Sequence, residues 1–283
     1  MNTVPFEMLA CPLDGGPLHR ESKTLRCAAG HSFDVARQGY VNLLPVQKKR
    51  SKDPGDSKVM VAARQRFLEA GFYQPIADAV TTATLEGAEA TGTLSCLDAG
   101  CGEGYYLRQL SGANAPAVLQ ALGLDISKWA VQSAARLDKR GTWVVGSNAN
   151  LPVLPETLDR VLCLFGFPVY PEFARVLRPG GRLVQVDASQ NHLRELREIV
   201  YPEVRAEPRK VSPVPDGFRR IETRDVRFTV HLDRAELIAD LLAMTPHLYR
   251  ASAEGRAKAA ELQDLSVTVD VCLQTFERYA PAG

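Results

Sequence analysis

Three glycines at alternating positions form the segment of this chain best suited to hold a small ligand. Gly100, Gly102 and Gly104 follow the apolar run Leu94–Leu97 and the acid Asp98. Glycines let the chain turn tightly and let a ligand lie close to the main chain. Free N–H groups at the start of a following helix favour a carboxylate, and Asp98 can bind the cationic end of a ligand. We therefore expect a ligand-binding turn between a buried strand and a helix.

A second set of residues near the amino terminus has the spacing of metal ligands. Cys11 is followed by Asp14, and Cys27 is followed by His31. Ribbon-type zinc sites place such pairs two to four residues apart on two turns. Asp14 stands where a fourth soft ligand is expected, and aspartate ligates zinc less softly than a thiolate does. The alternative is a degenerate site in which the cysteines pack as small apolar groups.

The glycine segment resembles motif I of the class I S-adenosylmethionine-dependent methyltransferases. In that family the loop passes beneath the methionine part of the cofactor, and an acid after the next strand binds the ribose hydroxyls. Asp125 occupies that place here. After the third strand, Asn148 or Asn150 would hold the adenine amino group, although either could equally be a turn residue. The resemblance implies S-adenosylmethionine as the cofactor.

The elements that must position these residues alternate along the chain. Short apolar runs separated by helical sequence predict an α/β fold with a parallel sheet covered by helices. The predicted strands are Leu94–Leu97, Val118–Leu124, Thr142–Val145, Arg160–Phe165 and Arg182–Val186. Two alternating segments, Arg224–Leu232 and Ser266–Phe276, predict an antiparallel pair at the sheet edge, separated by helical sequence over Arg234–Leu262.

Length and composition favour an ordinary globular protein in three parts. The chain has 283 residues, of which 45% are hydrophobic. We predict an amino-terminal module over 1–46, a basic linker with helices over 47–92, and a catalytic domain over 93–283. A module that small seldom folds without a metal or a staple.

Neither a membrane span nor a secretion signal is expected. No apolar run approaches the ~18 residues that a spanning helix needs, and no basic stretch precedes an apolar core at the start. We therefore expect a cytoplasmic protein with no membrane partner. In that compartment the six cysteines are expected to be ligands or core residues rather than disulfides.

Positive charge is concentrated in one segment, although the chain as a whole carries only +1. Between Lys48 and Arg66 seven basic residues face two acids, Asp53 and Asp56. Such a cluster can contact nucleic acid phosphates. By itself it is also typical of a solvated linker.

Several runs closely resemble the 23S ribosomal RNA (guanine-N1) methyltransferases, which methylate a guanine in a hairpin loop of the large-subunit RNA. The runs are Asn42-Leu43-Leu44-Pro45 and Lys48-Lys49-Arg50-Ser51-Lys52-Asp53-Pro54-Gly55-Asp56, followed by Arg64, Gly71 and Tyr73. They stand beside the cysteine module and the glycine segment. The resemblance covers most of the chain and is densest from Cys11 to Tyr106.

That resemblance implies a class I, Rossmann-like methyltransferase fold with a small zinc-ribbon-like module that binds RNA, a Zn²⁺ ion and a homodimer. It implies cofactor contacts by Tyr73, Gly100, Gly102, Glu103, Gly104 and His192. The residues expected to contact 23S RNA are Lys48, Lys49, Arg50, Lys52 and Lys58. The chain departs from the family at Asp14, where a second cysteine is expected, and this departure concerns the metal more than the methyl transfer.

Methylation at N1 of guanine requires loss of the N1 proton and alignment of the base with the methyl group. Asp53, Asp56 and Glu172 are candidate proton acceptors, and the sequence does not choose among them. Each is also an ordinary turn or surface acid. The segment Phe165–Pro171 ends the predicted fourth strand, and its aromatic side chains could stack on a base or belong to the core.

Two other functions remain open at this stage. A methyltransferase of this fold could act on a small molecule, because one fold hosts many acceptors. A non-catalytic RNA-binding protein with a relic cofactor pocket would share the amino-terminal module. The basic segment and the cysteine module disfavour the first, and the intact glycine segment with Asp125 disfavours the second.

Overall fold

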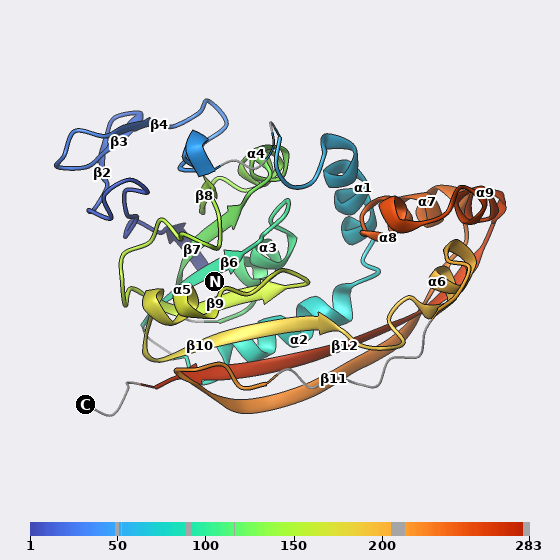
Figure 1. The fold of residues 1–283 in the computed structure, drawn as a ribbon. Helices are drawn as coiled ribbons and strands as arrows, with labels where there is room; N and C mark the ends of the chain where they lie inside the picture. The colour runs from blue at the N-terminus through green and yellow to red at the C-terminus, as the bar shows by residue number, and fades with distance from the viewer. Residues whose placement is uncertain (49–50, 52, 89–91, 116, 205–212, 280–283) are drawn as a thin grey trace.

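A mixed nine-stranded sheet forms the centre of the molecule (Figure 1). The computed structural model describes residues 1–48, 51, 53–88, 92–115, 117–204 and 213–279. The strands of this sheet are β1 (Asn2–Pro5), β5 (Tyr40–Asn42), β6 (Thr93–Ala99), β7 (Val118–Asp125), β8 (Thr142–Val145), β9 (Leu158–Leu164), β10 (Leu177–Ala188), β11 (Phe218–Leu232) and β12 (Leu265–Arg278). Their order is β11-β12-β10-β9-β6-β7-β8-β5, and β1 pairs with β7.

The strands that were expected to be parallel are parallel. Strands β6 to β10 run in one direction, and β12 enters antiparallel between β10 and β11. The chain goes from β6 outward to β7 and β8, and then returns to start again at β9 on the other side of β6. In such a sheet, ligands bind beyond the carboxyl ends of the strands at the point where the order reverses. Here that point lies between β6 and β9.

Helices cover both faces of the sheet. They are α1 (Lys58–Glu69), α2 (Gln74–Leu85), α3 (Tyr105–Gly112), α4 (Lys128–Leu137), α5 (Tyr170–Val176), α6 (Arg194–Val200), α7 (Ala235–Ala243), α8 (His247–Arg250) and α9 (Ala253–Glu261), with a short 3-10 turn, η1 (Val46–Lys48). Ser57 caps α1 and Ser127 caps α4, each through a side-chain oxygen that accepts an N–H three residues ahead.

The amino-terminal 46 residues are joined to the central sheet. A small three-stranded sheet of β2 (His19–Glu21), β3 (Thr24–Arg26) and β4 (Ser32–Asp34) stands apart from it. Yet β1 pairs in parallel with the first half of β7, and β5 pairs in parallel with β8. Phe6 and Leu9 are buried in the same core as strands β6 to β9. The module therefore gains stability from the larger core as well as from its own side chains.

A turn at Pro179-Gly180-Gly181 lies inside β10. The pairs Leu177–Leu158 and Arg182–Arg160 bracket it, so the chain loops outward while β9 advances only two residues. Gly180 takes a φ of +80°, which a side chain rarely adopts. The predicted strand Arg182–Val186 is therefore the second part of one longer strand that begins at Leu177.

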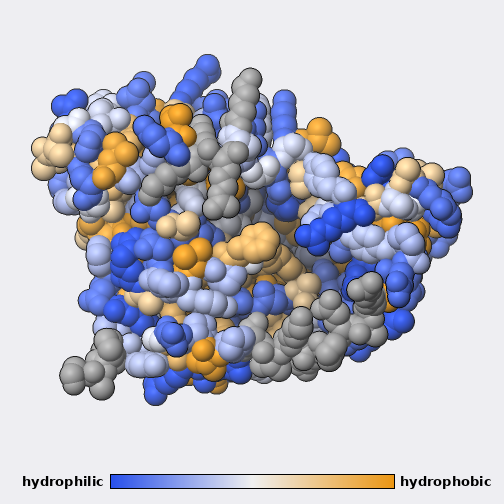
Figure 2. All heavy atoms as spheres, viewed as in Figure 1, coloured by the Kyte–Doolittle hydropathy of each residue, from blue (hydrophilic) through white to orange (hydrophobic). Residues whose placement is uncertain are grey.

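Two groups of elements stand on either side of the carboxyl edge of the sheet. The amino-terminal module lies at one side and α7–α9 at the other (Figure 1). Between them the surface is hollowed, and apolar atoms are exposed among hydrophilic ones (Figure 2). Large apolar side chains exposed in the described part of the chain include Phe167, at 89%, and Tyr249, at 67%. No helix among the described residues is long and apolar enough to cross a membrane.

Candidate functional site

The glycine turn lies where the strand order reverses, and its backbone requires glycine. Gly100, Gly102 and Gly104 have φ values of +97°, +55° and +82°. A side chain on Gly104 would also collide with the ring of Trp143, whose Cη2 lies 2.5 Å from an added Cβ. An added Cβ on Gly100 would meet nothing within 4 Å, so the turn is open above that residue. This open face can accept a ligand against the main chain.

Asp98 is a buried acid that lacks a partner. Its side chain is 1% exposed, and neither carboxylate oxygen accepts a hydrogen bond from the described residues. Burial, with smaller contributions from Asp125 and Glu103, raises the pKa of Asp98 to about 8. A charge buried without a partner is costly, and a cationic ligand would remove that cost. The ammonium group of S-adenosylmethionine has the required charge.

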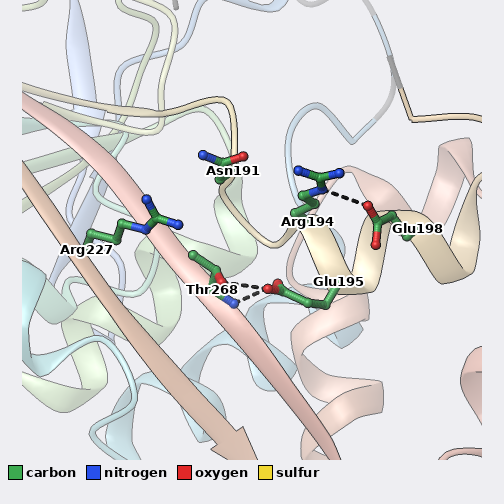
Figure 3. Close-up of a pocket in the computed structure, with 6 residues that line it drawn as sticks. All are labelled: Asn191, Arg194, Glu195, Glu198, Arg227 and Thr268. Carbon is green, nitrogen blue, oxygen red and sulfur yellow. Dashed lines mark hydrogen bonds and ion pairs between the residues drawn. The ribbon is translucent and has the colours of Figure 1, made fainter. Parts of the chain in front are cut away.

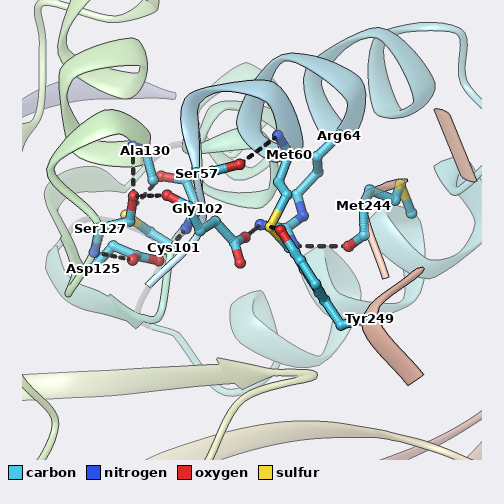
Figure 4. Close-up of polar contacts among 11 residues, drawn as sticks. Ser57, Met60, Arg64, Cys101, Gly102, Asp125, Ser127, Ala130, Met244 and Tyr249 are labelled. Carbon is cyan, nitrogen blue, oxygen red and sulfur yellow. Dashed lines mark hydrogen bonds and ion pairs between the residues drawn. The ribbon is translucent and has the colours of Figure 1, made fainter. Parts of the chain in front are cut away.

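Asp125 is held rigidly at the end of β7. Its Oδ2 accepts the N–H of Gly102 at 2.9 Å, and its Oδ1 accepts the N–H of Ser127 at 2.7 Å (Figure 4). Burial raises the pKa of Asp125, and these two hydrogen bonds oppose the shift. A carboxylate held in this position, beside Gly102 at the end of β7, fits a pair of ribose hydroxyls.

Glu103 has a partner of its own. It is 1% exposed and forms an ion pair of 2.8 Å with Arg108 on α3. Burial raises the pKa of Glu103, and Arg108 opposes the shift. The contact fixes the start of α3 under the glycine turn.

Tyr73 and His192 meet although 118 residues separate them in the sequence. The Tyr73 hydroxyl lies 3.4 Å from Nε2 of His192, while Nδ1 of His192 accepts the N–H of Asp270 at 3.3 Å. Because Nδ1 is an acceptor, the ring proton of the neutral imidazole belongs on Nε2. Burial lowers the pKa of His192 to about 4, so the ring is neutral at pH 7. Phe165 stacks on it at 5.8 Å between ring centres.

The two asparagines after β8 differ in what they contact. Asn148 donates to the carbonyl oxygens of Ala99 and Phe167, and its buried Oδ1 has no partner among the described residues. That oxygen is available to an adenine amino group. Asn150 instead donates to the carbonyl oxygen of Pro12, in the amino-terminal module. Asn148 therefore contacts the end of β6, the strand before the glycine turn, whereas Asn150 contacts the amino-terminal module.

Part of the basic segment, from Gly55 to Arg64, contacts the same site. Ser127 Oγ, labelled in Figure 4, donates to the carbonyl oxygen of Asp56 at 2.6 Å. A Cβ on Gly55 would lie 2.8 Å from Ile126. Arg64 forms an ion pair with Asp56 and donates to the carbonyl oxygen of Met244 at 2.9 Å. Nη1 of Arg64 also lies 3.5 Å from the position of a Cβ on Gly102. Asp56 and Arg64 thus join the basic segment to the glycine turn.

The five predicted RNA-contacting cations are described unequally. Lys49, Arg50 and Lys52 lie outside the described residues, and so does the side chain of Lys48. Lys58 is exposed at the first position of α1.

The three candidate proton acceptors are occupied or remote. Asp56 pairs with Arg64. Glu172 accepts the N–H of Leu151 at 2.7 Å and forms an ion pair of 2.8 Å with Arg175, so it braces the loop after β8. Asp53 is exposed, and within the described part of the chain no hydrogen bond or ion pair links it to the glycine turn. The role of all three as bases stays a prediction.

The predicted metal ligands converge. Nδ1 of His31 lies 2.9 Å from Oδ2 of Asp14, 3.3 Å from Sγ of Cys27 and 3.5 Å from Sγ of Cys11. All four ligand atoms lie within 4.8 Å of one another. Two sulfurs, a nitrogen and a carboxylate oxygen form a donor set that zinc accepts, and tetrahedral ligands stand at comparable separations. The residues therefore fit a zinc ion, with Asp14 in the place of a cysteine.

Arg64 was not among the site residues that the sequence singled out. Its partners are Asp56, eight residues away, and Met244, 180 residues away. No local pattern in the sequence pairs residues so far apart. Its place in the run that resembles the family was the one available signal.

A further hollow of about 310 Å³ lies beside α6 (Figure 3). Its lining residues are Asn191, Arg194, Glu195, Glu198, Arg227 and Thr268. The charges largely satisfy one another. Arg194 pairs with Glu198 at 2.7 Å, and Glu195 accepts both the N–H and the hydroxyl of Thr268. It adds no group that points to a ligand of its own.

Two segments of the chain match known protein families. Residues 9–52 match the zinc-ribbon family described as "RlmA, N-terminal", and residues 97–185 match a methyltransferase domain family. The crystal structure of YcgJ from Bacillus subtilis is 18% identical, with a TM-score of 0.46, covering 72% of this chain and 99% of that one.

Curated relatives match over nearly their whole length. The 23S rRNA (guanine(748)-N(1))-methyltransferase of Streptomyces fradiae is 34% identical, covering 93% of this chain and 96% of that protein. A Micromonospora griseorubida protein whose name places it among the 23S rRNA (guanine-N(1)-)-methyltransferases is 36% identical, covering 96% and 97%. The match spans the zinc-ribbon region, the basic segment and the methyltransferase domain together. The chain therefore belongs to the 23S rRNA (guanine-N1)-methyltransferase family and has a class I methyltransferase fold.

Proposed function

We propose that this protein transfers a methyl group from S-adenosylmethionine to N1 of a guanine in a hairpin loop of 23S ribosomal RNA. One observation carries the choice of an RNA acceptor over a small molecule. Within the basic segment, the carbonyl oxygen of Asp56 accepts a hydrogen bond from Ser127. Ser127 lies two residues after Asp125. A small acceptor does not need a cationic segment fastened to the cofactor site, whereas a phosphate backbone does.

Each proposed cofactor residue has a separate task. Asp98 receives the ammonium group, Asp125 the ribose hydroxyls, and Asn148 the adenine amino group. Gly100, Gly102 and Gly104 let the methionine part lie against the main chain. Tyr73 and His192 close the site below Phe165. When bound, the cofactor supplies an electrophilic methyl group on a sulfonium.

The protein's contribution is then position and exclusion of water. The acceptor base must approach from the side of β9 and β10, because Asp125 and the segment from Gly55 to Arg64 enclose the opposite side of the glycine turn. Phe167, on the turn after β9, has an exposed ring, and its carbonyl oxygen accepts a hydrogen bond from Asn148. RNA loop bases are commonly held on aromatic faces.

The amino-terminal module is proposed to bind one Zn²⁺ through Cys11, Asp14, Cys27 and His31, and to contact RNA. The ion would fix two turns that otherwise have little core of their own. Metal content of the purified protein, measured by atomic emission, tests this directly. We also propose a homodimer, which light scattering at several protein concentrations tests.

Primer extension on 23S RNA tests the proposed reaction. Purified protein and S-adenosylmethionine are incubated with unmethylated large-subunit RNA, and a methyl on N1 blocks Watson–Crick pairing. We expect one new stop, at a loop guanine, which disappears in Asp125→Ala. Methyl transfer to a metabolite without any RNA stop would instead support a small-molecule methyltransferase. Failure to bind cofactor in calorimetry would support the non-catalytic alternative.

A further inference from the structure

The carboxyl ends of β9 and β10 carry an acid that none of the roles above uses. Asp187 lies two residues beyond Gln185, which pairs in register with Cys163 of β9. The N–H of Phe165 donates to the carbonyl oxygen of Val186 at 2.8 Å. Asp187 is therefore the neighbour of Phe165 across the strands, where the acceptor base must approach.

A short hydrogen-bond chain orients this acid. The Tyr170 hydroxyl on α5 donates to Oε1 of Gln185 at 3.1 Å, and Nε2 of Gln185 donates to Oδ2 of Asp187 at 2.7 Å. Both hydrogen bonds are donated in the direction of the Asp187 carboxylate. Gln185 is buried and Asp187 is half-buried. Among the described residues nothing donates to Oδ1, and Oδ1 is not sealed from solvent. This series of hydrogen bonds thus leaves Oδ1 of Asp187 as an open acceptor.

The turn that follows β9 connects this oxygen to the cofactor side. Asn148 donates to both the Ala99 and the Phe167 carbonyl oxygens, which places the turn beside the end of β6. A Cβ on Gly166 would lie 3.4 Å from Sγ of Cys163 and 3.7 Å from the Ala99 oxygen. The turn from Phe165 to Phe167 therefore stands between the glycine turn's strand and Asp187.

We infer that Asp187 is a catalytic residue that accepts the N1 proton of the target guanine, an inference that rests on the proposed function. Guanine presents N1–H and the N2 amino group side by side, and an ionised carboxylate is an acceptor only. Adenine presents a lone pair at N1, which a carboxylate would repel. The same contact therefore selects guanine and removes the proton that blocks its nitrogen.

The step balances as follows. The N1–H bond breaks and its proton forms a bond to Oδ1 of Asp187, which becomes a neutral carboxyl group. The electron pair left on N1 forms the new bond to the methyl carbon, and the carbon–sulfur bond breaks with its pair remaining on sulfur. Asp187 then returns the proton to water.

The surroundings of Asp187 suit a proton acceptor. Burial raises the pKa of Asp187, and the bond from Gln185 opposes the shift. Cys163 on β9 and Tyr170 on α5 sense the charge of Asp187, and β12 places Cys272 opposite it and Asp270 two residues away. On β11, Asp225 lies opposite Cys272, with the cations Arg224 and Arg227 beside it. Burial and the bond from Gln185 are the causes of the pKa shift of Asp187, and neither is a cation.

Single-turnover methylation by Asp187→Asn tests the inference. Asparagine keeps an oxygen for Gln185 but cannot take a proton. We expect the rate at neutral pH to fall about 10²- to 10³-fold, a usual contribution of a general base, while the Kd values for cofactor and RNA stay within about two-fold, since asparagine keeps the packing. The remaining rate should climb with pH as guanine N1 ionises without help. Asp187→Ser, which adds no bulk, should give the same climbing profile.

Asp159→Asn is the matched control, because it makes the same chemical change at the other end of β9, where Asp159 accepts the N–H of Ser95 and pairs with Arg178. It should lower the thermal midpoint and leave the pH profile of the rate unchanged. A wild-type rate and profile in Asp187→Asn or Asp187→Ser, when the wild type methylates N1, would overturn the inference alone. If the wild-type protein placed no methyl on guanine N1, the proposed function would fall and this inference with it.

Discussion

At the scale of single residues, the decisive group is the carboxylate of Asp98. Strand β6 buries it completely, and the described residues supply no donor to either oxygen. In the folded protein it therefore holds its proton to about pH 8, whereas an exposed aspartate loses it near pH 4. A site of this kind gains the most from a ligand that brings a positive charge.

This leads to a prediction about stability and pH. Because folding raises the pKa of Asp98, the folded state binds more protons than the unfolded state between about pH 4 and pH 8. The free energy of unfolding of the cofactor-free protein should therefore fall as pH rises through that window. Denaturant titrations at a series of pH values should show the decline in wild type and a flatter curve in Asp98→Asn.

Cofactor binding provides a second measurement on the same group. An ammonium partner favours the ionised carboxylate, so about one proton should leave Asp98 on binding at pH 7. Calorimetry in two buffers of different ionisation enthalpy counts that proton. Equal proton release in wild type and Asp98→Asn would remove Asp98 from the role of ammonium partner.

At the scale of elements, helix α1 joins parts of the site that are distant in sequence. Arg64 contacts Asp56 in the preceding loop, and its second nitrogen reaches the end of α7 at Met244. Two residues further along, Arg66 binds Asp240 of α7 through two hydrogen bonds, one of them 2.8 Å long. Tyr249 of α8 donates to the sulfur of Met60. The helix thus couples the basic segment and α7–α8 to the glycine turn.

Arg64→Ala and Arg66→Ala separate these two connections. Losing Arg64 removes hydrogen bonds to a carboxylate and a carbonyl beside Gly102, about 1.5–3 kcal/mol for a charged group. Cofactor affinity should fall about ten-fold, since 1.4 kcal/mol is a factor of ten. Arg66 is largely exposed and does not face the glycine turn, so Arg66→Ala should loosen α7 and leave cofactor affinity nearly unchanged. Equal losses of affinity in both variants would contradict the assigned role of Arg64.

At the scale of the whole molecule, the distribution of charge matters more than its sum. A protein of net charge +1 has little general attraction for RNA. The proposed attraction is regional, from the basic segment beside the carboxyl edge of the sheet. Cations at the opposite edge, such as Arg178 and Arg219, are paired with acids. RNA should therefore be held on one side of the molecule only.

Reversing two charges on each side tests this arrangement. The double variant Lys49→Glu with Lys52→Glu should weaken RNA binding and reduce the slope of log K against log salt by about 1.4, at about 0.7 per lost phosphate contact. Arg178→Glu with Arg219→Glu makes the same change in net charge at the opposite edge and should leave the slope unaltered. Binding isotherms at four salt concentrations give both slopes, and identical slopes in the two variants would refute a one-sided RNA surface.

The sequence by itself determined the features that depend on neighbours along the chain. The alternating apolar runs predicted the strands and the edge pair, because burial on a sheet face repeats every two residues. The glycine turn and Asp98 were predicted to form a ligand site because strand, turn and helix follow one another directly, and the resemblance to class I methyltransferases added Asp125. The four predicted metal ligands were chosen by their spacing on two turns, and the structure brings them together.

Only the tertiary structure decided which distant groups meet. Neither the contact of Tyr73 with His192 nor that of Arg64 with Met244 follows from any local pattern. Burial also decides charge, since Asp98 keeps its proton because the sheet hides it, whereas Glu172, an equally plausible acid in the sequence, is neutralised by Arg175. Asp187 stood out only once the register of β9 and β10 placed it beside Phe165. Sequence patterns record what neighbours do along the chain, and the electrostatics of a site depend on what folding places across it.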